Sequence, residues 1–239
     1  ISTHFGNIKI KEFAPWINNL IKIFEKKDDI DLHIVAPNVF SNCNVFFQIN
    51  NIQYHFYKHN YILPYRVYNK LRINDKSNFY FIKRKIQKII HKIDPDLIHL
   101  HGAENPIYSA GILKLFNKYP CFTTIQGFIS LDEQANNPTN KKRKSIELKI
   151  LKNNLYFGVR TKDMCNYIST INEHAHFFWH HYPFTRPQIV EETNVKKDFD
   201  CAFFGRVASE NGVDDLLKAI AIVKQTKKDI SLIIVGPFG

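Results

Sequence analysis

Two spacings of apolar residues alternate along the chain, and each predicts a different kind of element. Short apolar runs bounded by turn-forming residues predict buried β-strands, whereas apolar residues that recur every three or four positions predict helices. The runs that predict strands lie at residues 31–36, 45–49, 52–57, 97–102, 121–125, 155–159, 175–182, 199–204 and 231–235. The spacings that predict helices lie at residues 15–24, 78–93, 107–118, 141–155, 162–168 and 213–225. Strands that alternate with helices predict parallel sheets covered by helices, so the predicted fold class is α/β.

The segment from residue 199 onward is the clearest unit of this kind. A strand, a helix and a second strand follow one another with short links and predict one right-handed βαβ unit. In parallel sheets, ligands bind beyond the carboxyl ends of the strands. Gly205 and Arg206 follow the first strand, and Gly236 follows the second. Because glycine lets a phosphate approach the backbone and arginine offers a planar fork of donors, these positions favour a phosphorylated ligand.

The sequence FFGRVASENGVDDLLKAIAIVKQ…ISLIIVG resembles the start of the donor-binding domain of the family 4 (group 1) retaining glycosyltransferases, which have the GT-B fold. In that family, Gly-Arg follows the first strand, Glu-Lys-Gly precedes the helix, and Val-Gly ends the second strand. The resemblance implies that Arg206 stabilises the leaving diphosphate. It also implies that the nucleotide site is shaped by Gly205, Asn211 and Gly236. Asn211 stands where relatives have the lysine that shares the role of the arginine.

Three motifs earlier in the chain resemble the same family. The sequence PDLIHLHG at residues 95–102 resembles a strand with the pattern Pro-Asp, apolar residue, His-x-His. IQGFIS at residues 125–130 and YFGVRTKDMC at residues 156–165 resemble loops of one of its subgroups. The resemblance implies that His101 and Gln126 are the catalytic positions beside the reacting sugar. Many relatives have histidine where this chain has the glutamine.

The same resemblance implies an acceptor side. The residues that would line it are Gly127, Arg160, Thr161 and His180. Thr161 also has a structural explanation, because threonine is a favourable N-cap for the helix that follows. His99 is expected to be a hydrogen-bonded core histidine. The His-x-His spacing lacks nearby cysteine or carboxylate partners, so no metal site is predicted.

The resemblance implies an α/β protein of GT-B-like architecture, with two Rossmann-like parallel-sheet domains. Residues 1–185 would form a nearly complete N-terminal acceptor-binding domain, residues 186–197 a linker, and residues 198–239 the first βαβ unit of a truncated donor-binding domain. One βαβ unit leaves apolar surface uncovered, so we expect more of the second domain in the intact protein. The carboxylates that relatives place on the donor sugar are not in this stretch, so the 239-residue chain alone is expected to be inactive.

The charge of the chain bears on its partners. The 33 lysines and arginines outnumber the 22 aspartates and glutamates, and the net charge of +11 favours anionic partners. Cations crowd one face of the predicted helix at 78–93 and begin the next basic helix at 141–144. Either an ordinary solvated helix face or docking on an anionic membrane surface would explain them.

The cysteines and the apolar runs bear on the compartment. The four cysteines have no paired spacing, which indicates free thiols in a reducing compartment. No apolar run is long enough to span a membrane, and no signal peptide is recognisable. We therefore expect a cytoplasmic protein, with peripheral attachment to the inner membrane face as an open alternative.

Together these features predict a glycosyltransferase. It would move a sugar from a UDP- or GDP-sugar to a saccharide or lipid-linked acceptor with retention, and without a metal or other cofactor, in the biosynthesis of cell-surface polysaccharide or glycoconjugates. One alternative is a degenerate, non-catalytic sugar- or nucleotide-binding module, which Asn211 and Gln126 suggest. The other is a nucleic-acid-binding protein, which the charge and the aromatic content suggest. No nucleic-acid-binding motif is recognisable, so nucleic acid is not the expected partner.

Overall fold

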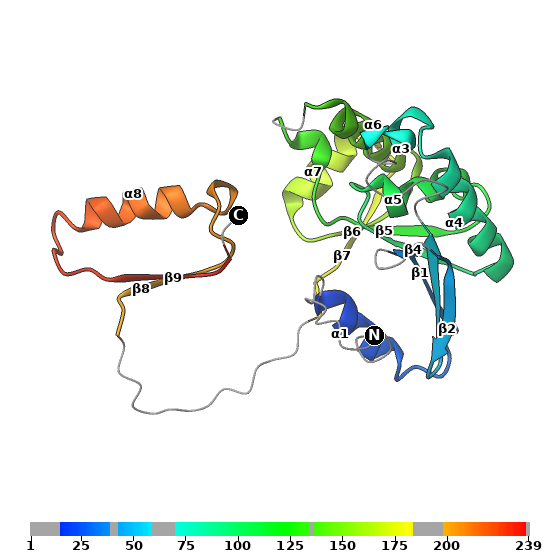
Figure 1. Ribbon diagram of the computed structural model, residues 1–239, viewed down its shortest axis with the longest axis horizontal. Helices are drawn as coiled ribbons and strands as arrows, with labels where there is room; N and C mark the ends of the chain where they lie inside the picture. Colours follow the sequence, from blue (N-terminus) through cyan, green and yellow to red (C-terminus); the bar gives the residue numbers. More distant parts are fainter. Residues whose placement is uncertain (1–14, 39–42, 59–69, 134–135, 184–197, 238–239) are drawn as a thin grey trace. The chain divides into compact units, whose positions relative to one another are not determined.

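The computed structural model describes residues 15–38, 43–58, 70–133, 136–183 and 198–237 (Figure 1). The chain divides into two compact units, Ile1–Thr185 and Arg186–Gly239. The predicted linker, residues 186–197, lies outside the described residues.

The larger unit contains a four-stranded parallel sheet. Its strands, in spatial order, are β4 (Ile98–His101), β5 (Cys121–Thr124), β6 (Tyr156–Val159) and β7 (His176–Trp179). Each strand pairs in parallel with the next one. The carboxyl ends of the four strands therefore lie along one edge of the sheet. The predicted α/β fold with a parallel sheet is confirmed.

A three-stranded sheet lies in the same unit. Its strands, in spatial order, are β1 (Leu32–Asn38), β3 (Ile52–Lys58) and β2 (Val45–Ile49). β1 and β3 are parallel, whereas β2 and β3 form an antiparallel hairpin. Asn50 turns the hairpin with a φ of 54°, in the left-handed region that asparagine tolerates better than most residues.

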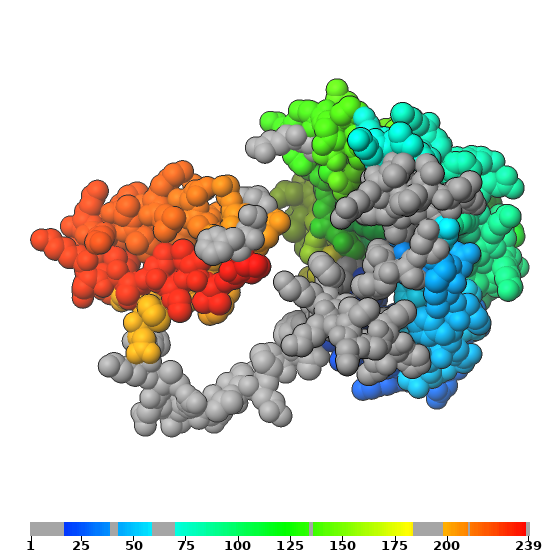
Figure 2. Space-filling view, in the orientation of Figure 1, coloured from blue at the N-terminus to red at the C-terminus, as the bar shows by residue number. Residues whose placement is uncertain are grey.

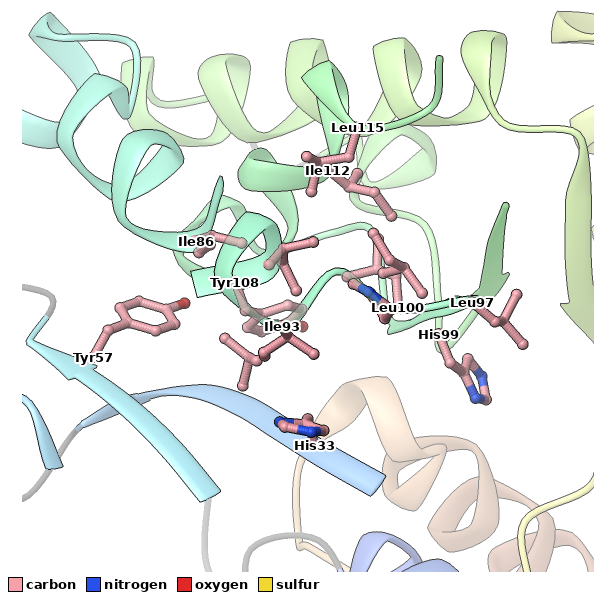
Figure 3. Close-up of a pocket in the computed structure, with 14 residues that line it drawn as sticks. His33, Tyr57, Ile86, Ile93, Leu97, His99, Leu100, Tyr108, Ile112 and Leu115 are labelled. Atoms are coloured by element: carbon pink, nitrogen blue, oxygen red, sulfur yellow. The ribbon is translucent and has the colours of Figure 1, made fainter. Parts of the chain in front are cut away.

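A cavity of about 130 Å³ lies between the two sheets. It is bounded by β1 and β4, which are the edge strands of their respective sheets. His33 and Tyr57 line it from the three-stranded sheet, and His99 and Leu100 line it from β4 (Figure 3). Most of its remaining lining consists of aliphatic side chains, which makes the cavity a continuation of the core.

Helices and 3₁₀ turns connect the strands of the larger unit. The elements are α1 (Pro15–Phe24), α3 (Ile73–Lys76), α4 (Tyr80–Ile93), α5 (Pro106–Ser109), η2 (Ala110–Lys114), η3 (Ile129–Leu131), α6 (Pro138–Asn153) and α7 (Lys162–Ile171). The single helix predicted at 107–118 is wrong, because α5 passes into the 3₁₀ turn η2. Gly111 in η2 lies so close to α4 that an added Cβ would be 2.5 Å from Ile86 Cγ2. This close approach requires glycine and accompanies the change in winding.

The prediction that the basic helix begins at Lys141 is also wrong. α6 begins at Pro138, and the side-chain oxygen of Asn137 caps it by accepting the backbone N–H of Asn140 over 2.8 Å. The four cations at residues 141–144 therefore follow the first turn. They oppose the helix dipole less there than they would at the terminus.

The core of the larger unit joins the four-stranded sheet to its helices. Fully buried side chains of this core include Ile82, Ile146, Leu151, Phe157 and Ile168. They come from α4, α6, β6 and α7, so one apolar cluster fixes these elements relative to one another. The loops at the carboxyl ends of the strands are thus attached to strands and helices that are fixed by core packing.

The smaller unit is a βαβ unit, as predicted. Its elements are β8 (Cys201–Phe204), the 3₁₀ turn η4 (Ser209–Asn211), α8 (Val213–Val223) and β9 (Leu232–Val235). β8 and β9 pair in parallel. Many of its apolar side chains reach solvent: Phe204 is 75 % exposed and Ile222 is 66 % exposed. Figure 2 shows both the orange atoms of α8 and the red atoms of β9 at the surface.

Candidate active site

Polar side chains gather at the carboxyl ends of the four parallel strands. His101 ends β4, Gln126–Gly127 follows β5, Arg160–Thr161 follows β6, and His180 follows β7. The residues predicted beside the reacting sugar and on the acceptor side are therefore brought to one edge of one sheet. Ligands bind at this edge in parallel α/β folds.

Three histidines cluster at this edge. The ring centroids of His99 and His101 are 3.9 Å apart, and those of His101 and His180 are 6.4 Å apart. Burial, together with the neighbouring His180, lowers the pKa of His101 to about 4. His101 is therefore neutral near pH 7 and can bind a ligand there only by hydrogen bonds, not as a cation. Nε2 of His99 lies 2.7 Å from Thr124 Oγ1, so the predicted hydrogen bond of this histidine is present, and its side chain is half-buried.

Arg160 links the loops that follow three strands. Its Nη2 donates to the backbone carbonyl of Gln126 over 2.6 Å. Its guanidinium carbon lies 4.5 Å from the centroid of the Tyr182 ring, within the range of a cation–π interaction. The Nε atom of Arg160 is buried and makes no hydrogen bond to any residue that the structure describes. The side chain is thus held in place with one donor unused.

Glu104 lies in the loop after β4 and is not predicted from the sequence. Its Oε1 accepts a hydrogen bond from the Tyr108 hydroxyl over 2.6 Å, and Arg143 Nε donates to its backbone carbonyl over 3.1 Å. Its Oε2 is buried without a hydrogen-bond partner among the described residues. Gly102 makes this arrangement possible: its φ is 84°, and an added Cβ would lie 2.7 Å from Glu104 Oε2. The position of Glu104 soon after a strand that ends in glycine is the signal that could have found it.

Three buried polar atoms at this edge lack a partner in the described part of the chain, namely Glu104 Oε2, Arg160 Nε and His180 Nε2. A buried polar atom without a partner costs about 1–3 kcal/mol, so folded proteins keep few of them. Glu104 offers an acceptor, Arg160 a donor, and the neutral ring of His180 either one. A ligand rich in hydroxyl groups both donates and accepts, and would satisfy all three atoms.

A buried carboxylate fixes the loop after β5. Glu147 of α6 is fully buried and accepts the backbone N–H groups of Ile129 over 3.0 Å and Ser130 over 2.8 Å. The Tyr167 hydroxyl donates to Ser130 Oγ over 2.7 Å. Burial raises the pKa of Glu147, and the hydrogen bonds from this loop oppose that shift. The same loop carries Gly127, where an added Cβ would meet no described atom within 4 Å, so there is open space in front of it.

Thr161 has a structural role. Its Oγ1 accepts the backbone N–H of Met164 over 3.3 Å and caps α7. This confirms that Thr161, which belongs to the motif at residues 156–165, is the N-cap of α7. A contact between Thr161 and an acceptor stays a prediction.

Residues 12–161 match a protein-family model described as glycosyl transferase 4-like. The chain belongs to the glycosyl transferase 4-like family. The matched stretch covers more than half of the chain and includes the ends of β4, β5 and β6. It ends at Thr161, before His180 and the smaller unit. No match was found among curated proteins.

In this glycosyl transferase 4-like protein, the predicted donor-side residues gather in the smaller unit. The N–H of Gly205 donates to the carbonyl of Val235 over 3.0 Å, and a Cβ added to Gly236 would lie 1.7 Å from the Gly205 oxygen. The backbone of Gly205 therefore leaves no room for a side chain at position 236. Asn211 Nδ2 donates to the backbone carbonyl of Arg206 over 2.7 Å, while the Arg206 side chain is exposed. The amide thus stabilises the loop that carries Arg206.

Within the ranges that the structure describes, no group of three or more His, Cys, Asp or Glu side chains is arranged to hold a metal ion.

Proposed function

We propose that this glycosyl transferase 4-like protein is a retaining enzyme that moves a sugar from a UDP- or GDP-sugar to a hydroxyl group of a saccharide or lipid-linked acceptor. Membership of the family supports glycosyl transfer in general. An acceptor site in the larger unit is supported by the three buried polar atoms at the sheet edge that have no hydrogen-bond partner among the described residues. Their mixture of acceptor and donors suits the hydroxyl groups of a sugar better than it suits a purely anionic or purely apolar ligand.

In the proposed reaction, the bond between the anomeric carbon and the diphosphate oxygen breaks, and a bond from that carbon to the acceptor oxygen forms on the same face. The acceptor proton passes to the leaving phosphate oxygen, so no protein base is needed. This agrees with the low pKa of His101, about 4, which makes it a weak base near neutral pH. Arg206 would stabilise the charge that develops on the diphosphate, and for this reason we propose transfer without a metal.

On the acceptor side, Glu104 and Arg160 would bind acceptor hydroxyl groups through their unused atoms. His180 would contribute the third hydrogen bond. Gln126 and Gly127 would lie beside the transferred sugar, on the loop that Glu147 holds. The buried environment of these groups would strengthen each hydrogen bond to the ligand.

Calorimetry with UDP-, GDP- and ADP-sugars tests the donor side, and a transfer assay with the labelled donor that binds tests the acceptor side. Arg206→Ala should weaken donor binding by about tenfold or more, because a charge-assisted contact is lost. Glu104→Gln and Arg160→Gln should lower transfer while leaving donor affinity unchanged. If a protein with a complete second domain binds no sugar nucleotide, the proposed function is wrong.

A non-catalytic sugar- or nucleotide-binding module is the second candidate. Asn211 favours it, because its amide bonds to the Arg206 carbonyl and adds no cation for the diphosphate. The same assays separate the two candidates. Donor binding without transfer or donor hydrolysis would support the module, whereas turnover would exclude it.

We also propose that the protein works in the cytoplasm, attached peripherally to the inner membrane face, in polysaccharide or glycoconjugate biosynthesis. The net charge of +11 supports attachment to an anionic surface. Among the described residues, no helix is both long and apolar enough to cross a membrane. Cell fractionation tests this location: the protein should be recovered with membranes at low salt and released by high salt, and recovery only in the supernatant would contradict it.

A further inference from the structure

A second hollow lies away from the candidate active site, between α4 and one face of the three-stranded sheet. It has a volume of about 620 Å³ and is open to solvent. None of the residues assigned above to donor or acceptor lines it. Its volume is within the range of pockets that hold small-molecule ligands, roughly 300–1,000 Å³.

The helix presents cations to this hollow. α4 places Ile82, Ile86 and Ile90 in the core. It lines the hollow with Lys85, Lys88 and Lys92, together with Ile89 and Ile93. These lysines are three and four positions apart, so they lie on one side of the helix. A helix that packs on a sheet normally buries apolar side chains at the contact. The lysine flank is therefore not explained by packing.

The sheet face opposite the lysines is polar as well. His33 and His55 of neighbouring strands are joined, with Nδ1 of His33 2.9 Å from Nε2 of His55. Among the described residues that line the hollow, Asp31 is the only carboxylate, and it is already engaged by Gln53 Nε2 at 3.3 Å and by His33 Nε2 at 3.3 Å. Three lysines thus face one occupied carboxylate, which leaves an excess of positive charge in the hollow.

The individual lysines differ in their surroundings. Lys85 Nζ donates to the backbone carbonyl of Lys58, which holds it against the hairpin. Lys88 and Lys92 are exposed and form no ion pair with any described residue. Burial lowers the pKa of His55, and the neighbouring His33 and Lys92 add to that shift. An anion bound here would relieve this repulsion.

An aromatic ring stands beside the cations. Phe46 of β2 lines the hollow, is 62 % exposed, and has its ring centroid 4.9 Å from that of His55. An exposed aromatic ring next to cations is suited to a ligand that has a flat or apolar part as well as a negative charge.

We propose that this hollow is a binding site for a phosphate ester, separate from the donor and acceptor sites. Lys88 and Lys92 would bind the phosphate oxygens as point charges, and Lys85 would close the site from the hairpin side. Phe46 would contact the organic part of the ligand, and the His33–His55 pair would form the floor of the site. The ester can be a soluble metabolite or a phospholipid headgroup, because both present the same phosphate chemistry.

Titration with inorganic pyrophosphate tests the site. All proteins carry Arg206→Ala, so that the predicted donor site contributes nothing and a failure here leaves the proposed function untouched. Lys88→Gln/Lys92→Gln should weaken pyrophosphate binding by about tenfold or more. The matched control is Lys149→Gln/Lys152→Gln, which removes the same charge from exposed positions on α6 and should change affinity by less than about twofold.

Equal weakening in the two double variants would show that net charge alone attracts pyrophosphate, and would overturn the proposal. If the protein that keeps all its lysines does not bind pyrophosphate, the proposal is also wrong. A measurement without lysine substitutions guards against misfolded variants. Ring signals of His33 and His55 in NMR spectra should shift on addition of pyrophosphate, and unchanged signals at saturation would place the ligand elsewhere.

Vesicles identify the source of the phosphate. The protein is sedimented with phosphatidylcholine vesicles that contain or lack phosphatidylglycerol. Sedimentation that requires the anionic lipid, and that Lys88→Gln/Lys92→Gln abolishes while the α6 control retains it, assigns the site to a headgroup. Binding of pyrophosphate without such sedimentation assigns it to a soluble ester.

Discussion

Replacing Gly158 with alanine tests how closely the sheet edge is packed beneath the candidate active site. Gly158 is in β6, and an added Cβ would lie 2.8 Å from Phe122 Cζ, 3.0 Å from His180 Cβ and 3.0 Å from Thr124 Oγ1. Carbon atoms in contact are normally about 3.5–4.0 Å apart. The Phe122 ring and the backbone at His180 therefore have to move by roughly half an ångström or more.

The expected cost combines two opposing effects. Forcing an extra methyl group into a packed core costs about 1–3 kcal/mol. Replacing glycine with alanine also stabilises the folded state by about 0.4–1 kcal/mol, because it lowers the conformational entropy of the unfolded chain. The balance is a loss of about 1.5 kcal/mol, which corresponds to a melting temperature lower by about 3–6 °C for a unit of this size.

Gly127→Ala is the matched control, because the same change at that position meets no described atom within 4 Å. Thermal unfolding of the two variants measures the difference. The Phe122 ring lies near both His99 and His180, with ring centroids 4.8 and 6.3 Å away, so the histidine ring signals in NMR spectra should shift in Gly158→Ala. Equal melting temperatures for the two variants, with unshifted histidine signals, would refute the close packing described for this edge.

Three further predictions concern titration and capping. Because burial raises the pKa of Glu147, the folded state binds more protons than the unfolded state above pH 4.5, and stability should fall as the pH rises through the raised pKa. Denaturant unfolding of Glu147→Gln at several pH values should lack this decline, and an identical decline in both proteins would argue against it. The pKa values of His99 and His101 are lowered to about 3 and about 4, so these groups should destabilise the fold as the pH falls below 6.5, and NMR titration should show both rings uncharged at pH 6. Thr161→Ala should cost about 1 kcal/mol of unfolding free energy through loss of the α7 cap, whereas the conservative Thr161→Ser should not.

The strands were predictable because each is a short apolar run bounded by turn-forming residues. The polar residue that ends such a run must lie at the ligand-binding edge, and for this reason His101, Gln126, Arg160 and His180 are placed there by the sequence alone. Glu104 does not end such a run, and the sequence marks it only by its place soon after Gly102. Its position depends on the left-handed turn at Gly102 and on contacts with side chains from other elements.

The two errors in helix prediction have different causes. The break between α5 and η2 is non-local, because it depends on the approach of Gly111 to Ile86 in another helix. The early start of α6 is local: Asn137 followed by Pro138 is a capping signal that the basic residues after it obscure. The first error needs tertiary information to correct, whereas the second needs only closer attention to the cap.

The exposed apolar side chains of the smaller unit have a consequence for calorimetry. Among its described residues, Val213 is the one apolar side chain that is fully covered. Heat capacity rises on unfolding mainly because apolar surface becomes hydrated, and here most of that surface is hydrated already. The smaller unit should add comparatively little to the heat capacity change of this chain, so the main heat-absorption peak will report chiefly the larger unit. A ligand that stabilises only the βαβ unit would leave that peak where it is.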